Sequence, residues 1–552
     1  MAVLVQMNRY VYLTHMKPAT LHTSLRNLLY TFTPEAAAQK AELLQRLSSM
    51  PLKADTLLIE YHEMLMYMLA YPDNRAVYQA AEREMKRIAA MLKALPDTRK
   101  TAVQDNGLPF TRMTARFTAD MLDLLEEDSQ CTVQLDSFEE GGRSLASVLA
   151  ATLPGVDKEK AAAEDDNLAL LDALDIRPAN RLRFILSELR SLDAQPQIKD
   201  LLWQELRAFV TIDAQHLSFS RAFNRVQDAG VFYHDMLQKR IDFAQMLHTP
   251  LPAAEALNSA QRDQLIGVIR RAMVLTMRET DTSTFMQPAS LRYFVLERGI
   301  SVAVYGMTAP HQLPLQSYIG YTLFKNGFPA AYGGSWVFGN TALFGLNVLD
   351  SFRGGESAVI MGQLLRVYHQ LFSLASIEVE AYQIGKDNDD GISSGAYWFY
   401  HRFGFRSCNA KLRKLAADEE RKIAASKNYR SSRKTLLALA ESNVALTISK
   451  AASNRVDDYL ARISAHIARH YQGIRRDAVL QATRKLMVDL QVDEGFVQTY
   501  RHSFEEWALF ADCVEVKDKI ARTILRKLIV SKETDPYSYN QSVCELMKKL
   551  HG

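Results

Sequence analysis

The sequence predicts a multidomain α+β protein in which one mixed α/β sheet domain lies between large all-α regions. Most of the β-type apolar runs and glycine turns fall between Tyr318 and Arg406. On both sides of this stretch, apolar residues recur at the spacing of helices. A chain of 552 residues is also too long for one core. We therefore expect about three or four domains.

Composition places the chain among ordinary globular proteins. Apolar residues make up 48% and charged residues 23%, and the formal net charge is +3. A net charge this small gives no global argument for binding nucleic acid or an anionic membrane. Cys131, Cys408, Cys513 and Cys544 lack CxxC spacing, so we expect reduced thiols and no metal site.

Targeting signals are not visible in the sequence. The first ten residues lack the basic and apolar regions of a secretory signal. No apolar run reaches the roughly 18 residues that a membrane-spanning helix needs. We therefore expect a cytoplasmic protein that does not associate with membranes.

Four ranges are expected as domains: helical regions at 1–152, 169–290 and 411–552, and the α/β domain at 291–410. The segment Leu153–Asn167 is charged and opens with Pro-Gly, which favours a boundary. Periodicity predicts helices over Ala36–Leu47, Leu57–Ala70, Arg75–Leu95, from Leu168 to about Leu247, and over Ser259–Met277 with Ser259 as N-cap. Cys131–Asp136 is expected to be a short strand.

The α/β domain is expected to begin with a strand at Ile300–Tyr305 and a hairpin at Gly320–Gly334. Asn326-Gly327 is a strong two-residue turn signal, because both positions of a type I′ turn need positive φ. The elements predicted next are a strand at 342–349, a helix at Ala358–Phe372, a strand at Ser376–Tyr382 and a short aromatic helix before Phe403-Gly404-Phe405.

The strand–loop–helix junction at Arg353–Ala358 is where a phosphate would bind. Gly354 and Gly355 allow a ligand to approach the backbone closely, and the free N–H groups of the next helix attract anions. The junction is not a Walker loop and lacks the GxGxxG spacing of dinucleotide-binding folds. A tight structural turn is the alternative interpretation.

The order hairpin, strand, Arg-Gly-Gly-Glu-Ser-Ala loop, helix, strand and aromatic helix resembles the GNAT superfamily of N-acetyltransferases. That family marks its acyl-CoA loop with Gln/Arg-x-x-Gly-x-Gly/Ala. Arg353 and Ala358 match the first and last positions, and Glu356 stands where the middle glycine belongs.

The closing pattern of the family, Asn-x-x-Ala-x-x-x-Tyr-x-x-x-Gly-Phe, has a counterpart after the second strand. Ala396, Tyr400 and Gly404-Phe405 match, and Ser393 replaces the asparagine. The resemblance covers about Ile300–Arg406, less than a quarter of the chain.

The resemblance implies transfer of an acyl group from acyl-CoA, such as acetyl-CoA, to an amine, without a metal. It implies pantetheine between the strand ending at Leu349 and the strand Ile377–Tyr382. The residues it assigns to the cofactor are Asn347, Val348, Leu349, Arg353, Gly354, Gly355, Glu356, Ser357, Ala358 and Ser393.

Two side chains are candidates for catalysis. The resemblance implies that Tyr400 protonates the leaving thiolate. The attacking amine needs a base or a relayed water. Strand alternation would place Glu378 and Glu380 on one face, with Glu380 nearer the middle of the site, and we prefer it as the base. The alternatives are aromatic packing for Tyr400 and a solvated or salt-bridged strand glutamate for Glu380.

Three other motifs give weaker evidence for a function. His62-Glu63 lacks the second histidine of HExxH, and Tyr233-His234-Asp235 has no visible nucleophile. The basic run Lys411–Lys434 is either a solvated helical face or a surface for nucleic acid or an acidic partner.

Three functions stay open: an N-acyltransferase acting on a small-molecule or protein amine, a non-catalytic scaffold, and an aminoacyl-tRNA-dependent transferase. Glu356 and Ser393 favour the scaffold. The basic run would contact RNA in the third.

Overall fold

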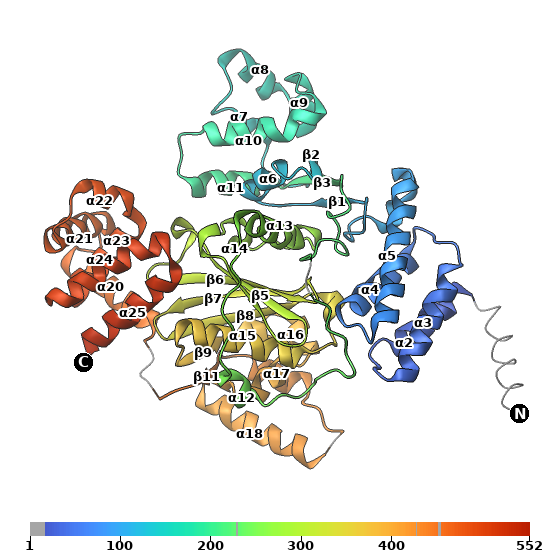
Figure 1. Ribbon diagram of the computed structural model, residues 1–552. Helices are drawn as coiled ribbons and strands as arrows, with labels where there is room; N and C mark the ends of the chain where they lie inside the picture. Colours follow the sequence, from blue (N-terminus) through green and yellow to red (C-terminus); the bar gives the residue numbers. More distant parts are fainter. Residues whose placement is uncertain (1–16, 228–229, 427, 451–453, 552) are drawn as a thin grey trace, which may run out of the picture. The chain divides into compact units, whose positions relative to one another are not determined.

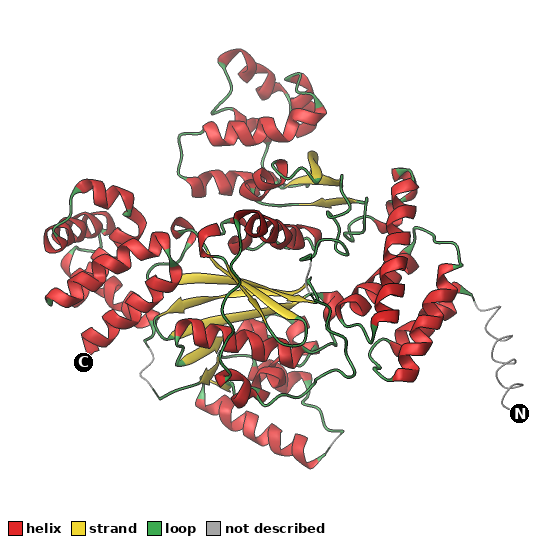
Figure 2. Cartoon of the chain, viewed as in Figure 1, coloured by secondary structure: helices red, strands yellow, loops and turns green. Residues whose placement is uncertain are grey.

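The computed structural model describes residues 17–227, 230–426, 428–450 and 454–551 (Figures 1 and 2). The chain forms two compact units, and neither is one continuous segment. Unit 1 comprises Met1–Leu237, Asp263–Thr284 and Lys325–Pro329, and unit 2 comprises Gln238–Arg262, Phe285–Phe324 and Ala330–Gly552. No helix in the described part of the chain is long and apolar enough to cross a membrane.

The described part of unit 1 begins with four helices: α2 (Pro18–Leu28), α3 (Pro34–Ser48), α4 (Thr56–Ala70) and α5 (Arg75–Ala94). The three helices predicted here are confirmed. Thr33, Asp55 and Asn74 cap them, each accepting a hydrogen bond from a backbone N–H in the first turn. The side chains of Lys40 and Asp73 form a buried ion pair with an N···O distance of 2.9 Å, which ties α3 to the turn before α5.

A three-stranded antiparallel sheet, ordered β1-β3-β2, organises the rest of unit 1. β2 (Cys131–Phe138) confirms the predicted strand. β1 (Arg112–Ala115) and β3 (Ala208–Ala214) lie in regions predicted to be helical, so that prediction was wrong there. β3 is the central strand, and Ala208, Val210 and Ile212 point into the core. Short strands between helices give too few residues for a clear period.

Six helices contribute to the same core as this small sheet: α6 (Ala119–Glu126), α7 (Leu145–Leu149), α8 (Gly155–Ala163), α9 (Asn167–Ala173), α10 (Arg181–Ser191) and α11 (Pro196–Leu206). The segment Leu153–Asn167, expected as a boundary, contains α8. Leu153 and Ala161 belong to a core that extends in sequence from Met113 to Leu275. The chain before and after this segment therefore shares one core.

Three further helices are α12 (Phe243–His248), α13 (Ser259–Leu275) and α14 (Asp281–Thr284). The predicted N-cap at Ser259 is wrong by one residue. Asn258 Oδ1 accepts from the N–H of Gln261, and the Gln261 side chain accepts from the N–H of Asn258. This reciprocal pair is a capping box built from amide side chains.

Unit 2 contains an eight-stranded sheet in the order β10-β11-β9-β8-β7-β6-β5-β4. The strands are β4 (Arg292–Val295), β5 (Ile300–Gly306), β6 (Ser317–Lys325), β7 (Phe328–Phe338), β8 (Thr341–Val348), β9 (Ser376–Val379), β10 (Arg406–Ser407) and β11 (Val444–Thr447). The predicted first strand, hairpin and strand at 342–349 are confirmed. β11 lies in a region predicted to be helical, and that prediction was wrong.

The helix α15 (Ser357–Phe372) packs on one face of this sheet (Figure 1). The buried Tyr368 connects α15 to the sheet. Its hydroxyl donates to the carbonyl of Ile319 on β6 over 2.6 Å, and its ring lies edge-on to those of Tyr321 and Phe344. The helix predicted at Ala358–Phe372 is confirmed.

Between β9 and β11 come the short helix α16 (Asp389–Ser393), the aromatic helix α17 (Ala396–Arg402), α18 (Ala410–Ala425) and α19 (Arg433–Leu439), with β10 between α17 and α18. A helical bundle completes unit 2: α20 (Val456–His470), α21 (Arg475–Leu490), α22 (Glu494–Thr499), α23 (Arg501–Val514), α24 (Lys519–Thr534) and α25 (Pro536–His551). Its core surrounds Phe504 and Trp507.

A buried carboxylate, Asp512 on α23, joins three elements of the bundle. It accepts hydrogen bonds from Lys485, Tyr471 and His466 at 2.6, 2.7 and 2.8 Å. Burial acts to raise the pKa of Asp512, but the three hydrogen bonds outweigh it and lower the pKa to about 2.

This depressed pKa predicts acid sensitivity of the bundle. The stabilisation from Asp512 is present above the ordinary aspartate pKa of about 3.9 and is lost as pH falls towards about 2. Asp512→Asn should lower the free energy of unfolding at neutral pH by about 1 kcal/mol and flatten its decline over that interval. Urea unfolding followed by tryptophan fluorescence at several pH values measures this. Asp477→Asn, at an exposed site on α21, is the control, and equal profiles for both variants would contradict the assignment.

The glycine at position 334 is predicted to be irreplaceable in the sheet. A Cβ there would lie 2.3 Å from the ring of Tyr318, whereas a Cβ on its cross-strand partner Gly345 would meet nothing closer than 3.6 Å. Gly334→Ala should therefore cost about 1–3 kcal/mol of unfolding free energy through overpacking. Gly345→Ala should stay within about 0.5 kcal/mol of the wild type. Urea titration measures the unfolding free energy of both variants. Equal losses in the two variants would contradict the prediction.

Candidate functional site

The parallel pair of β8 with β9 separates soon after it begins. Its register covers Thr341–Leu343 on β8 and Ser376–Glu378 on β9. β8 continues to Val348 with β7 alone as its partner, whereas β9 ends at Val379. The second half of β8 therefore has an open edge where an extended ligand could pair with the backbone.

The backbone at the end of β8 is partly engaged. The N–H of Leu349 donates to the carbonyl of Ala330 on the β7 side, over 2.9 Å. Successive residues of a strand present their N–H groups to opposite edges, so the N–H of Val348 faces the open side. Asn347 is exposed at this point. Pantetheine was predicted to contact Asn347, Val348 and Leu349. The N–H of Leu349 is already bonded to Ala330, so the N–H of Val348 is the better partner for pantetheine.

Gln383 lies at the start of the open edge. It belongs to the short helix η7 (Ala381–Ile384), which follows β9 directly. A Cβ on Gly345 would lie 3.6 Å from the side-chain nitrogen of Gln383, so this amide sits against the backbone of β8. Sequence analysis did not single out Gln383, since a glutamine in a short turn gives no signal.

The loop from β8 to α15 passes through η6 (Asp350–Phe352) and the two glycines. Gly354 has φ of +81°, a conformation that favours glycine. The first helical hydrogen bond of α15 runs from the N–H of Ile360 to the carbonyl of Glu356. The N–H groups of Ser357 and Ala358 precede that bond and are not used by the helix, so they can face a ligand.

The carboxylate of Glu356 points into unit 2, away from solvent. The residue is 0% exposed, and its Oε1 accepts from Arg298 Nε and from the N–H of Gln238, both over 2.9 Å. The negative charge is therefore paired inside the protein. A phosphate bound at the two glycines would not meet this charge directly.

Arg353 is exposed at the other end of the loop. Its guanidinium pairs with the exposed Asp350 at 3.1 Å and lies near the carbonyl of Val348. Ion pairs at such exposure contribute little to stability, so Arg353 can exchange Asp350 for a ligand phosphate. Ser393 is exposed at the end of α16, where its hydroxyl bonds to Asp390, and its described contacts do not include this loop.

Tyr400 on α17 is 3% exposed and lies among the rings of Phe399 and Phe405. Burial raises its pKa, so the phenol keeps its proton at neutral pH. Burial also raises the pKa of Tyr321, and the nearby Tyr400 is the second largest cause of this shift. The hydroxyl of Tyr321 donates to the carbonyl of Gly345 on β8 over 3.0 Å, so Tyr321 connects the surroundings of Tyr400 to this strand.

Glu380 does not share a strand face with Glu378, and the prediction that it would was wrong. β9 ends at Val379, and Glu380 is an exposed residue that starts the turn into η7. The reason is Asn443, whose amide donates to Glu378 over 2.7 Å and accepts from the N–H of Ala381. This side chain from the β11 region ends the predicted strand three residues early.

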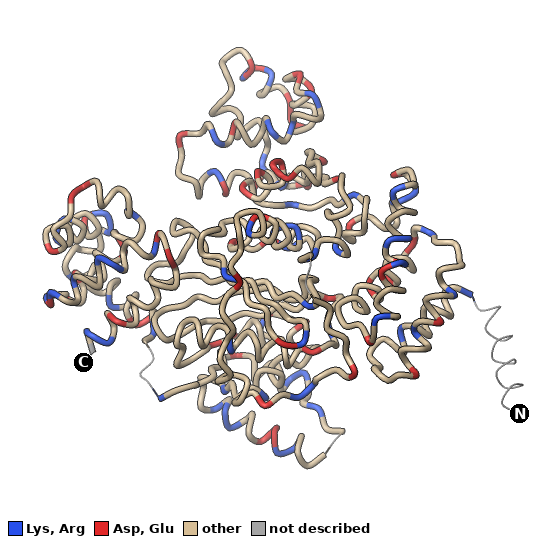
Figure 3. The backbone as a smooth tube through the Cα atoms, viewed as in Figure 1, with Lys and Arg blue, Asp and Glu red and all other residues tan. Residues whose placement is uncertain are grey.

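The basic run Lys411–Lys434 contains acidic residues in the same helix (Figure 3). Its charges are largely used locally: Arg421 pairs with Asp418, Lys422 with Glu419 and Arg433 with Asp389, while Arg413 donates to the carbonyls of Ser407 and Cys408. Lys414 is exposed and has no ion pair within the described residues.

The two histidine motifs lie in unit 1 as core elements. His62 is fully buried beside Glu63, and His234 is packed among the rings of Tyr71 and Phe232. Among the described residues, no group of three or more His, Cys, Asp or Glu side chains could hold a metal ion.

Comparisons with protein-family models, with curated proteins and with solved structures found no match to this chain. Any functional assignment therefore depends on the residues and their geometry. The open edge of β8, the glycine loop, the first turn of α15 and Tyr400 together form the candidate site.

The ion pair that orients Glu356 should be essential for stability. Glu356→Ala leaves the Arg298 guanidinium without its carboxylate, which should cost about 3–5 kcal/mol of unfolding free energy. The double variant Arg298→Met with Glu356→Leu should recover much of this loss, because it removes both charges. A double-mutant cycle in urea measures the coupling. Additive losses would show that the two side chains do not depend on each other.

Proposed function

We propose that unit 2 is an N-acyltransferase with a GNAT-like fold that moves an acyl group from acyl-CoA to an amine. One observation carries the proposal. A parallel strand pair separates after three residues, and the open strand leads through a glycine loop into a helix N-terminus. This combination offers an extended edge for pantetheine next to N–H groups for a pyrophosphate. The element order also agrees with the one on which the resemblance depends.

The cofactor would be held mainly by backbone groups. Pantetheine amides would pair with the open edge of β8, where the N–H of Val348 is available. The pyrophosphate would lie against Gly354, Gly355 and the first N–H groups of Ser357 and Ala358. Arg353, released from Asp350, would add a charge-assisted contact. The inward orientation of Glu356 supports this arrangement, because no carboxylate then faces the phosphates at the loop.

The chemistry requires two proton transfers. The amine nitrogen attacks the thioester carbonyl and must lose a proton, and the departing thiolate of coenzyme A must gain one. The buried phenol of Tyr400 suits the second step, because it is protonated and lies near Tyr321, whose hydroxyl contacts β8. Glu380 is an exposed carboxylate that directly follows the last residue of β9. It would accept the amine proton directly or through a water.

A titration with acetyl-CoA, coenzyme A and longer acyl-CoAs tests the proposal. We expect binding of the full-length protein at micromolar strength, about 8 kcal/mol, measured by calorimetry and by thermal shift. Gly354→Asp and Arg353→Glu should abolish or strongly weaken it, because each places a carboxylate at the pyrophosphate. Tyr400→Phe should keep the affinity and reduce acyl transfer once an acceptor amine is found.

Lys414→Glu is the matched control, since it changes the net charge as Arg353→Glu does but on α18. It should leave acyl-CoA binding unchanged. If no acyl-CoA stabilises the wild type at millimolar concentration, the proposal is wrong. Total tRNA would then be titrated across a salt series, where binding that weakens steeply with salt would favour the tRNA-dependent alternative.

A further inference from the structure

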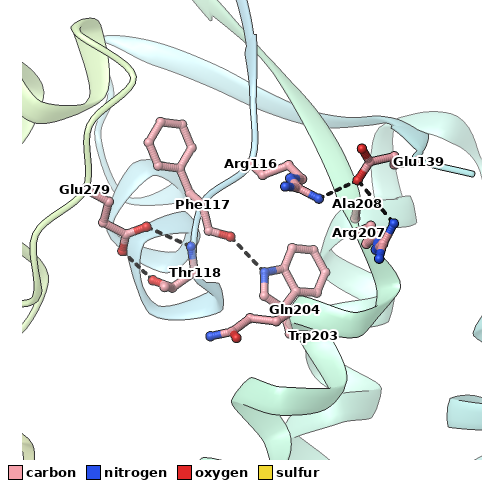
Figure 4. A pocket seen from close by; sticks show the side chains of 9 residues that line it. All are labelled: Arg116, Phe117, Thr118, Glu139, Trp203, Gln204, Arg207, Ala208 and Glu279. Atoms are coloured by element: carbon pink, nitrogen blue, oxygen red, sulfur yellow. Dashed lines mark hydrogen bonds and ion pairs between the residues drawn. The ribbon is translucent and has the colours of Figure 1, made fainter. Parts of the chain in front are cut away.

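A separate cavity of about 630 Å³ lies entirely within unit 1 (Figure 4). Its walls come from the segment after β1, the end of β2, the α11–β3 junction and Glu279 near α14. This volume is in the range of sites for small organic ligands. Neither the candidate acyltransferase site nor any sequence motif accounts for it.

Two arginines converge on one carboxylate at one end of this cavity. Arg116 donates to Glu139 over 2.7 Å, and the nearest guanidinium nitrogen of Arg207 lies 3.8 Å from the same carboxylate oxygen. All three side chains are close to half exposed. Each guanidinium uses only part of its five donors in these contacts. Glu139 therefore occupies the position that the carboxylate or phosphate of a ligand could take.

The backbone of Arg207 adds a second observation. This residue ends α11 in the left-handed conformation, with φ of +51° and ψ of +38°. Glycine is the residue favoured at such a helix end, and an arginine there carries a conformational cost. In this conformation the Arg207 side chain lines the cavity beside Glu139 (Figure 4).

The rest of the cavity is less charged. Trp203 is buried, and its indole N–H donates to the carbonyl of Phe117 over 2.8 Å, which fixes the ring along the cavity wall. At the opposite end, Glu279 accepts from the N–H and the hydroxyl of Thr118, so this carboxylate is already hydrogen-bonded. An aromatic wall beside paired guanidinium groups suits a ligand with a flat apolar part and an anionic group.

We propose that this cavity binds a small organic anion, whose carboxylate or phosphate displaces Glu139 from Arg116 and Arg207 and whose apolar part lies against Trp203. The site is independent of the acyl-CoA site, because all its residues belong to unit 1.

Calorimetric titration of the full-length protein with benzoate, phenyl phosphate, inorganic phosphate and the neutral phenol tests the proposal. At least one aromatic anion should bind with a Kd at or below about 1 mM, and phenol should not. Preference between benzoate and phenyl phosphate identifies the anionic group. Glu139→Gln should tighten binding several-fold, because it removes the competing carboxylate.

Arg207→Gly is the decisive variant, since glycine favours this backbone conformation and the fold should be kept. It should weaken binding about tenfold or more, as should Arg116→Gln. Arg183→Gln on α10, an exposed arginine outside the cavity, and Gly354→Asp in unit 2 should leave binding unchanged. The proposal is overturned if neither aromatic anion binds the wild type or Glu139→Gln at about 10 mM, or if Arg207→Gly binds as the wild type does.

Discussion

The buried carboxylate of Glu356 is the interaction on which the junction of β8 and α15 depends. An unpaired charge at zero exposure would be very costly, so Arg298 is required as its partner. Arg298 lies in the turn between β4 and β5 with φ of +60°, and Gln238 donates its N–H to the same oxygen. One side chain thus connects the first hairpin of the sheet and the start of unit 2 to the N-terminus of α15.

Small residues in neighbouring strands set the shape of the open edge. A Cβ on Gly333 would lie 2.7 Å from the hydroxyl of Tyr321, so only glycine lets that hydroxyl reach the carbonyl of Gly345. Tyr321 in turn packs against Tyr368 of α15, which fixes the helix on the sheet. The glycines therefore influence both the packing of α15 and the surroundings of Tyr400.

Local signals in the sequence were sufficient for much of this architecture. Long apolar periods predicted α3, α4, α5 and α15, and Asn326-Gly327 predicted the β6–β7 hairpin. What could not be predicted depends on residues far away in the chain. Asn443 ends β9 early from more than sixty positions downstream, and the direction of Glu356 is decided by Arg298. The cavity beside Arg207 could not be predicted, because no sequence pattern marks an arginine with a left-handed backbone conformation.

The interleaved path of the chain has a consequence for its synthesis. Unit 1 takes in Asp263–Thr284 and Lys325–Pro329, whereas residues of unit 2 intervene from Gln238 onwards. A nascent chain emerging from the ribosome therefore cannot complete unit 1 until position 329 has been translated. Domains commonly fold one after another as they emerge. Here the first unit must wait with part of its core missing, so truncation before that point should leave neither unit whole.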